Sequence, residues 1–458
     1  RMSMKISRPK LSDYFKLPNP GLRAYFKRTE QGSEDDIRPP FWKGISREAV
    51  LNMWSKELKR LGIAEKYPGL YEYETEMKSK VGPMSVQAPL KDRLESIKDY
   101  YSAQKGEPVM REALSAVISE FKPLAGLRLR SPEQTILNMD LSKNSGSPFF
   151  TKKRNVVNLL DEAADYLMIA VLGWRGQEGG LSYDEVKQRV IWMMPFLLNV
   201  WELQCYQPAI EIVQLHKLIP AYVNFQEVDR RVTALFDSRK DINQQVVCSD
   251  FSKFDQHFGL CMQDAARYIF EMLCPNLYEW LELVFPIKYH IPLICSDDIM
   301  FSGPHGMASG SGGTNFDESL AHRALQYECA IRNGSELNQH SMAYGDDGIL
   351  TYPGIEVEQV TESYTRHGQE MNLIKQMVST SEAVVLRRWY STSYRKSNIM
   401  VGVYSTFRAL GRLLAQERYY DPEIWGAKMV TLRAWSILEN CEHSPYFEQF
   451  VDFVIQGD

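Results

Sequence analysis

The chain has 458 residues, 44% of them hydrophobic and 24% charged, so it can form roughly two to four lobes with substantial cores and is not dominated by disorder. Its formal net charge of -5 argues against a protein that coats nucleic acid with a basic outer surface, but it leaves room for a locally basic channel. The seven cysteines have no paired short spacing, which disfavours both a disulfide framework and a zinc site.

The chain shows no candidate membrane span. Its longest apolar stretch, residues 190–198, is interrupted by Pro195 and is far shorter than the roughly 20 residues that a membrane helix needs. Nothing near Arg1 has the pattern of a signal peptide. We therefore expect the chain to work in a reducing or enclosed compartment.

In chain order, the first forty residues are rich in Pro, Lys and Arg and predict an extended arm. Helices then dominate, beginning with residues 46–62, for which the sequence predicts an N-cap at Ser46, an apolar stripe and a stop at Gly62. Short β-rich runs between helices predict a sheet with helices packed on one face, and they lie at 245–251, 341–352 and 383–390. A helical lobe is expected from about residue 391.

The central acidic residues stand at predicted strand ends. The apolar run 246–248 leads into Asp250, and Asp255 follows five residues later. A carboxylate that leaves a core strand is costly unless a cation meets it. The string SMAYGDDGILTY, residues 341–352, predicts two strands around a tight turn, in which Gly345 supplies backbone freedom and Asp346 and Asp347 lie at the tip. If this hairpin pairs beside the first strand, Asp250 and Asp346 converge.

Such a cluster has the chemistry of a divalent-metal site. Oxygen ligands without nearby His or Cys suit magnesium or manganese, and two such ions about 4 Å apart form the clamp used in phosphoryl transfer. A Gly-Asp-Asp string also occurs in ordinary polar turns. Asp297 and Asp298, in CSDDIMF, are a second acidic pair; they have the pattern of a turn and stay open as the alternative metal pair.

A glycine-rich segment lies between the two acidic motifs. Its loop carries Gly306, Gly310, Gly312 and Gly313, and Thr314 or Asn315 starts a helix that ends at Gly334. Without a Gly-Lys-Ser/Thr string it is not a P-loop. Two interpretations are open: a mobile surface loop, or a platform that a nucleotide or template strand passes closely, with the Ser309 and Thr314 hydroxyls touching sugar or base.

Three motifs therefore follow one another in order. The first is an Asp-x4-Asp string at Asp250 and Asp255. The second is a Ser-Gly-x3-Thr string at Ser309, Gly310 and Thr314, and the third is a Gly-Asp-Asp string at Gly345, Asp346 and Asp347. This set resembles the RNA-dependent RNA polymerases of viruses, and the strings DFSKFDQHF and SGSGGTNFDE most resemble those of picobirnaviruses, then partitiviruses, both double-stranded RNA viruses. The resemblance in motif order covers roughly residues 145–390.

The resemblance implies an α+β right-hand polymerase that copies an RNA template. It implies an N-terminal arm and fingers at 1–240, a palm at 241–390 with a fingers segment at about 262–305, and a helical thumb at 391–458. The implied partners are template and nascent RNA, ribonucleoside triphosphates and a viral capsid protein. The implied location of RNA synthesis is the interior of the virion or the host cytoplasm. A reverse transcriptase and a non-catalytic RNA-binding subunit with a relic palm remain the rival functions.

The resemblance also implies roles for individual residues. Two Mg²⁺ or Mn²⁺ ions would be held by Asp250 and Asp346 with support from Asp347, and Lys375 would be the general acid unless it is a surface lysine. Nucleotide-binding residues would be Asp255, Ser309, Gly310, Thr314, Asn315, Lys187 and Arg189. RNA-binding residues would be Ser145, Gly146, Lys152, Lys153, Arg154, Arg387 and Arg388, although short basic groups are usually solvated faces.

One position departs from the family pattern. Many members have an Asn four residues after the motif Thr, where it helps the second Asp of the first motif to recognise the ribose 2′-hydroxyl. Here Thr314 is followed by Asn315, Phe316, Asp317 and Glu318. Sugar recognition by Asp255 is still expected, because this hydroxyl distinguishes RNA from DNA. Which residue assists it is left open.

Overall fold

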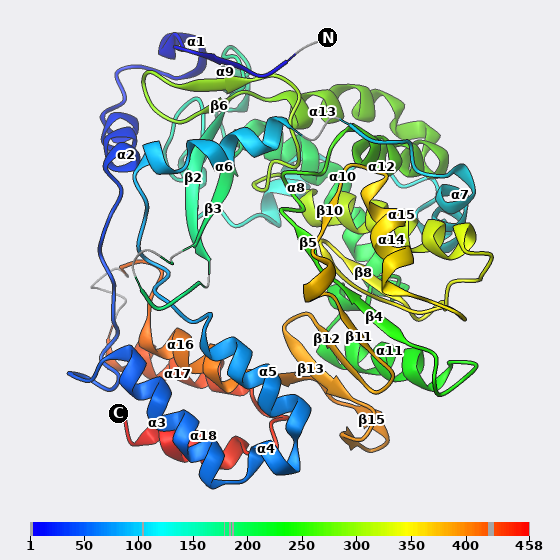
Figure 1. The fold of residues 1–458 in the computed structure, drawn as a ribbon. Helices are drawn as coiled ribbons and strands as arrows, with labels where there is room; N and C mark the ends of the chain where they lie inside the picture. Colours follow the sequence, from blue (N-terminus) through cyan, green and yellow to red (C-terminus); the bar gives the residue numbers. More distant parts are fainter. Residues whose placement is uncertain are drawn as a thin grey trace. The chain divides into compact units, whose positions relative to one another are not determined.

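The computed structural model describes residues 3–102, 105–177, 179–182, 185, 187–419 and 426–457. The chain forms two compact units (Figure 1). The first unit contains residues 1–31, 90–173 and 190–380, and the second contains 32–89, 174–189 and 381–458. This division does not test the expected fingers, palm and thumb boundaries, which remain a prediction.

The N-terminal segment is more ordered than its composition indicates. The expectation of an extended arm is wrong for residues 20–31, which form helix α2, Pro20–Gln31. Leu22 and Phe26 lie four positions apart and are buried, so they share one helix face. The proline at the first helical position favours a helix start, although the abundance of Pro and basic residues suggested a loop.

The first unit is built around two sheets. A five-stranded sheet has the order β1-β7-β6-β2-β3, and a four-stranded sheet has the order β11-β4-β9-β8. The strands of the first are β1 Lys5–Ser7, β2 Ala170–Gln177, β3 Lys187–Met193, β6 Leu293–Ile294 and β7 Met300–Ser302. Residues 174–177 of β2 and 187–189 of β3 are assigned to the second unit. Those of the second are β4 Val246–Ser249, β8 Met342–Tyr344, β9 Asp347–Leu350 and β11 Met377–Ser379, and a separate pair is β5 Phe251–Ser252 and β10 Glu370–Met371.

Helices of the first unit bury the largest core against the four-stranded sheet. The longer ones are α7 Arg111–Glu120, α10 Phe196–Leu215, α11 Phe225–Asp237, α12 Leu260–Leu273, α13 Tyr278–His290, α14 Thr314–Arg332 and α15 Val357–Thr365. The shorter helices of the first unit contribute to smaller cores, and they are α1 Leu11–Tyr14, α6 Leu94–Lys98, α8 Pro132–Leu137 and α9 Leu160–Ala163. Helix α14 is almost wholly buried although it carries several charged and polar residues, so each of these needs a partner inside the protein.

The second unit is mainly helical. Its helices are α3 Arg47–Arg60, α4 Ile63–Lys66, α5 Pro68–Lys78, α16 Thr406–Leu414, α17 Ala427–Glu439 and α18 Phe447–Ile455, and its strands are β12 Glu382–Val385, β13 Arg388–Ser391, β14 Arg395–Lys396, β15 Ile399–Met400 and β16 Val403–Tyr404. Ser46 caps α3 by accepting from the Ala49 amide, as the sequence predicts. The fully buried Trp54 packs against Tyr446 and Phe450, so α3 and α18 share a core.

No helix in the described part of the chain combines the length and apolar character needed to cross a bilayer.

Candidate active site

The two acidic motifs meet at one end of the four-stranded sheet. Strands β4 and β9 pair antiparallel, and their last matched residues are Ser249 and Gly348. Asp250 directly follows Ser249 and Asp347 directly precedes Gly348, so the two aspartates flank this last matched pair. Facing residues of an antiparallel pair have Cα atoms about 4.5–5.5 Å apart. The hairpin therefore lies beside the first strand, as the sequence analysis required.

The Gly-Asp-Asp string forms the predicted tight turn. Tyr344 and Asp347 are paired across the β8-β9 hairpin, so Gly345 and Asp346 are its two loop residues. Gly345 has a φ of 60°, in the left-handed region that favours glycine. A Cβ at this position would also lie only 2.9 Å from Nδ2 of Asn315. The turn is thus closed against the start of α14, and Asp346 is exposed at its tip.

Helix α14 holds both backbone polar groups of Gly345. The Gly345 amide donates to Oγ of Ser319 at 2.9 Å, and Nδ1 of His322 lies 2.9 Å from the Gly345 carbonyl oxygen. Burial lowers the pKa of His322 to about 4, so its ring is neutral and Nδ1–H is the donor. Ser319 and His322 are three residues apart and share one helix face. This face fixes the turn that carries Asp346.

A buried carboxyl group, Glu318, lies between the acidic motifs. Its side chain is 4% exposed and is hydrogen-bonded to the side chain of Asp255. Burial raises the pKa of Glu318 well above its usual range, and the nearby charges of Asp255 and Asp346 raise it further. The sequence analysis did not select Glu318 as a site residue. The signal that could have found it is its position four residues after Thr314, where many family members have an Asn.

The glycine-rich loop is held by its own hydroxyl groups. Ser309 Oγ donates to the Val190 carbonyl at 3.0 Å, and Thr314 Oγ1 lies 3.1 Å from the Ala308 and Ser311 carbonyl oxygens. A Cβ at Gly310 would lie 1.6 Å from the Trp192 carbonyl oxygen, so only glycine fits there. The loop therefore has a defined shape, which favours the platform over the mobile surface loop.

A buried polar network lies under this loop. Lys288 Nζ is 2.7 Å from Oδ2 of Asp317 and 3.1 Å from the Tyr206 hydroxyl. Ser311, in the loop, donates to Glu202, whose Oε2 is 3.9 Å from Lys288 Nζ. Burial raises the pKa of Glu202 to about 7. The sequence analysis missed this network because its members come from α10, α13 and α14.

Lys375 lies three residues after Asn372, which forms a backbone hydrogen bond with Asp250. It is exposed at the end of a short 3₁₀ turn, Leu373–Lys375, and the Asn372 amide donates to the Asp250 carbonyl at 3.1 Å. Pairing of Met371 with Phe251 continues this contact. The Lys375 segment is therefore tied to the strand that ends in Asp250.

The predicted RNA-binding residues differ in exposure. Lys152 and Arg154 are exposed, whereas Lys153 is partly buried, and burial followed by the charge of Lys143 lowers its pKa. Ser145 and Gly146 are buried in the turn that precedes them, where the Ser145 amide donates to the Thr151 carbonyl and the Thr151 amide donates to Ser145 Oγ. These two positions shape the turn.

The other basic residues named from the sequence belong to the second unit. Lys187 and Arg189 are exposed on β3. Arg387 is exposed in the turn between β12 and β13 with a φ of 61°. Arg388 is buried, and its Nη1 donates to the Gly402 carbonyl at 3.4 Å. Neighbouring arginines in the sequence thus have different surroundings.

The alternative acidic pair occupies a different turn. Asp297 and Asp298 lie between β6 and β7 of the five-stranded sheet, and Asp298 forms an ion pair of 3.0 Å with Arg8. The Asp298 amide donates to Ser296 Oγ at 3.2 Å. These contacts are those of a polar turn. The pair is on another sheet from Asp250, so the first assignment is favoured.

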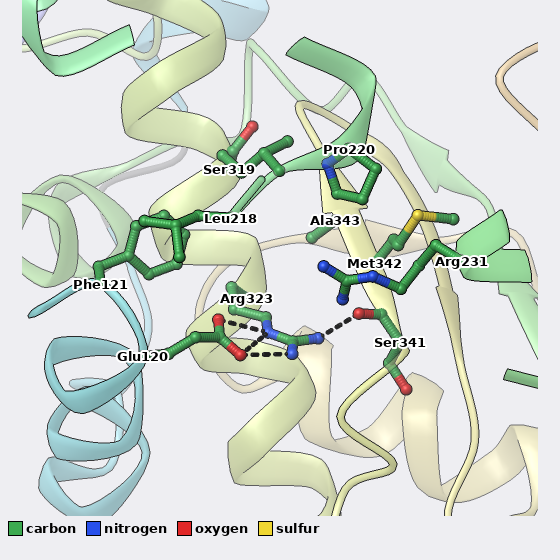
Figure 2. A pocket seen from close by; sticks show the side chains of 11 residues that line it. Glu120, Phe121, Leu218, Pro220, Arg231, Ser319, Arg323, Ser341, Met342 and Ala343 are labelled. Atoms are coloured by element: carbon green, nitrogen blue, oxygen red, sulfur yellow. Dashed lines mark hydrogen bonds and ion pairs between the residues drawn. The ribbon is translucent and has the colours of Figure 1, made fainter. Parts of the chain in front are cut away.

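A small cavity lies behind β8 (Figure 2). It holds about 10 Å³, which is room for roughly one water molecule. On its wall, Arg323 pairs with Glu120 at 2.6 Å and donates to the Ser341 carbonyl at 2.6 Å. The cavity is too small for a nucleotide. Its ion pair fastens α14 to α7 and to the start of β8.

A family model described as viral RNA-dependent RNA polymerase matches residues 182–444. Fold and site thus define a viral RNA-directed RNA polymerase, and the chain belongs to this family. This membership favours RNA synthesis over reverse transcription and over a non-catalytic role.

Its relatives are picobirnavirus polymerases. A potential RNA-dependent RNA polymerase of Human picobirnavirus (strain Human/Thailand/Hy005102/-) is 49% identical over 474 residues, covering 99% of this chain and 88% of that protein. Two crystal structures of a human picobirnavirus RNA-dependent RNA polymerase are also 49% identical, each with a TM-score of 0.94. The insertion-loop deletion mutant matches over 98% of this chain and 92% of that one, and the other structure over 98% and 89%. The α+β right-hand fold is confirmed.

Proposed function

We propose that this polymerase joins nucleotides by two-metal nucleotidyl transfer, with Asp250 and Asp346 as the principal metal ligands and Asp347 in support. The observation that carries this proposal is the β4-β9 register, which brings the two acidic motifs to one sheet end. Among the described strands, those that pair with β6 and β7 beside Asp297 and Asp298 carry no second acidic motif.

The side chains present fit Mg²⁺ or Mn²⁺ rather than zinc. Within the described ranges, no group of three or more His, Cys, Asp or Glu side chains is arranged to hold a metal ion alone. Mg²⁺ commonly binds through one or two carboxylates together with water and substrate phosphates, so the aspartates and an incoming triphosphate together would suffice. When bound, the two ions would supply charge stabilisation of the attacking and leaving oxygens.

The remaining residues bind and orient the nucleotide. Asp255 reads the ribose, beside a wall formed by Ser309, Gly310, Thr314 and Asn315. Lys187 and Arg189 hold the triphosphate, for which the forked donors of arginine are well suited. Lys375 donates a proton to the departing pyrophosphate as a general acid, and it belongs to the segment that Asn372 joins to the Asp250 strand. The loop hydrogen bonds described above keep this wall in place before the nucleotide arrives.

RNA-binding residues are proposed in each unit separately. Lys152, Lys153 and Arg154 contact template phosphates after the turn at Ser145 and Gly146, and Arg387 and Arg388 belong to the hairpin that supports the growing strand. We further propose a viral capsid protein as partner and synthesis inside the particle or in the host cytoplasm. Incorporation by purified chain with and without capsid protein would test this partnership.

The metal assignment is tested by Asp346→Asn, with Asp298→Asn as the matched control from the other acidic turn. Purified variants are given a primed RNA template, four ribonucleotides and Mg²⁺. We expect Asp346→Asn to lose on the order of 100-fold or more in incorporation, because several kcal/mol of charge stabilisation disappear. RNA binding and the thermal unfolding midpoint should change little. Full activity in Asp346→Asn, or an equal loss in Asp298→Asn, would refute the assignment.

A further inference from the structure

The second half of the glycine-rich loop lies directly on helix α10. Ser311 Oγ donates to Oε2 of Glu202, and the Gly312 amide donates to the same carboxyl group. A Cβ on Gly313 would stand 2.0 Å from Cζ of Tyr206, so the loop backbone touches the ring of this tyrosine. Glu202 is fully buried, and it accepts from one hydroxyl and one backbone amide of the loop.

The first half of the loop is held by another element. Ser309 Oγ donates to the Val190 carbonyl at 3.0 Å, and Gly310 closes against the Trp192 carbonyl, both on β3. The loop is thus held between β3 and α10, and its contact with α10 depends on the Glu202 carboxyl group. Ser309 and Gly310 belong to the proposed nucleotide wall, so the shape of this wall depends on both contacts.

A buried cation stands beside the Glu202 carboxyl group. Lys288 is fully buried, and its Nζ lies 3.9 Å from Glu202 Oε2 and donates to Asp317 Oδ2 at 2.7 Å. Asp317 also accepts from the Tyr206 and Tyr289 hydroxyls at 2.7 Å each. A buried charge is tolerated where it is paired and hydrogen-bonded. Lys288 therefore joins α10, α13 and the first turn of α14 into a common base for the loop.

The Glu202 carboxyl group is poorly suited to a role in stability alone. Its Oε1 is buried and has no hydrogen-bond partner within the described ranges, while Oε2 accepts from Ser311. Burial of a carboxyl group with an unpaired oxygen destabilises the folded state. An apolar side chain of similar volume would avoid this cost, but it could not bond the loop. These contacts therefore favour a role in fixing the conformation of the loop.

We propose that Glu202 is a positioning residue that holds residues 311 and 312 of the loop and so preforms the proposed nucleotide wall. This inference rests on the proposed function, in which the loop lines the nucleotide site. Without the carboxyl group the loop would populate other conformations, and only molecules with the ordered loop would bind a nucleotide. The apparent dissociation constant rises as the ordered fraction falls. The turn that carries Asp346 is held separately by Ser319 and His322, so the chemical step should change less.

The test measures amide hydrogen exchange of residues 309–314 and single-nucleotide incorporation with a primed RNA template and Mg²⁺. Glu202→Ala removes the acceptor, and Glu202→Gln keeps an acceptor oxygen and most of the side-chain volume in case the Ala variant does not fold. In Glu202→Ala we expect the loop amides to exchange about 10-fold faster and KM for the nucleotide to rise about 10-fold, while kcat changes by less than about threefold. Glu202→Gln should lie between Glu202→Ala and the unmodified chain.

Ser311→Ala tests the same contact from the loop side without changing the buried base. It should also speed exchange of the loop amides and raise KM for the nucleotide. Because Glu202 acts through Ser311, Ser311→Ala should have little further effect when it is added to Glu202→Ala. Fully additive effects on KM would show that the two residues act independently, which would refute the proposed contact.

The same substitutions at Glu74 are the matched controls. Glu74 is a fully buried glutamate of the second unit that likewise accepts from a serine hydroxyl, Ser405, and a backbone amide, that of Thr406. Its variants should lower the thermal unfolding midpoint and leave loop exchange and KM unchanged. An equal rise of KM in the Glu74 variants would show that lost stability alone explains the effect, and it would overturn the inference.

Failure of this inference can be separated from failure of the proposed function, because exchange of the loop amides reports the loop without a nucleotide. Unchanged loop exchange in Glu202→Ala and Glu202→Gln would overturn the role of Glu202 and leave the proposed function intact. Faster loop exchange with an unchanged KM would overturn the proposed nucleotide wall, and with it the inference. The metal assignment is decided independently by Asp346→Asn.

Discussion

The amide of Gly345 donates to Oγ of Ser319 at 2.9 Å, which joins the turn that carries Asp346 to the helix that begins at the glycine-rich loop. His322 bonds the carbonyl of the same glycine from the next helical position on that face. The turn that carries the proposed metal ligand Asp346 and the helix that follows the proposed nucleotide-binding loop are thus joined by hydrogen bonds. A shift of α14 would move the turn with it.

Ser319→Ala should weaken this assembly. The change leaves the buried Gly345 amide without its acceptor, at a cost of about 1–3 kcal/mol. We expect a lower thermal unfolding midpoint and turnover reduced by about 10-fold, with little change in KM for the nucleotide, because the turn rather than the sugar pocket is disturbed. Ser335→Ala removes an exposed hydroxyl that bonds the Pro353 carbonyl, and it should leave turnover unchanged. Equal turnover in both variants would contradict the proposed coupling.

Lys375→Ala tests the general acid. We expect turnover to fall by roughly 10- to 1000-fold with little change in nucleotide affinity, which is the size of effect typical of proton transfer. The measurement is single-turnover incorporation under conditions in which chemistry limits the rate. Lys375→Arg keeps the positive charge but holds its proton too tightly to donate it. Full activity in Lys375→Arg would assign Lys375 a purely electrostatic role.

Arg387 and Arg388 should respond differently to alanine. Arg387 is exposed, so its loss should weaken RNA binding at low salt and reduce the slope of log affinity against log salt by about 0.7–1. Arg388 is buried against Gly402, so its loss should mainly lower the unfolding midpoint. Binding titrations at several salt concentrations and thermal unfolding separate these outcomes. An unchanged salt slope in Arg387→Ala would remove this residue from the RNA contacts.

Glu202 should make stability depend on pH. Burial raises its pKa in the folded chain to about 7, above the ordinary value of 4.5. Between pH 4.5 and pH 7 Glu202 keeps its proton in the folded state but has lost it in the unfolded state. The contribution of Glu202 to the free energy of unfolding therefore falls as the pH rises from about 4.5 to 7, and it is constant above about pH 7. The total change is on the order of 3 kcal/mol at 1.36 kcal/mol per pKa unit.

The measurement compares the unmodified chain with Glu202→Gln, which cannot ionise but can still accept from Ser311. The unfolding midpoint of the unmodified chain, relative to the variant, should be higher at pH 5 than at pH 8. Parallel midpoints across this range would show that Glu202 does not titrate in the folded protein.

Much of the site was readable from the sequence because its motifs are local. Asp250 at a strand end, the Gly345 turn and the helix after Thr314 depend on periodicity and turn chemistry within a few residues, and each was found where it was expected. The order of these motifs also identified the polymerase class. The same local reasoning failed at residues 20–31. Their composition suggested an extended arm, but they form a helix that is stabilised by the burial of Leu22 and Phe26 on one face.

Tertiary structure alone decided which polar groups meet. Glu318 and Asp255 are 63 positions apart, and Lys288 reaches Asp317 from another helix, so no short spacing reveals either contact. Likewise, Arg387 and Arg388 are adjacent in the sequence, yet one is exposed and the other buried. Strand pairing and helix packing set these neighbours, because the cost of burying a polar group depends on the partner that the whole fold provides.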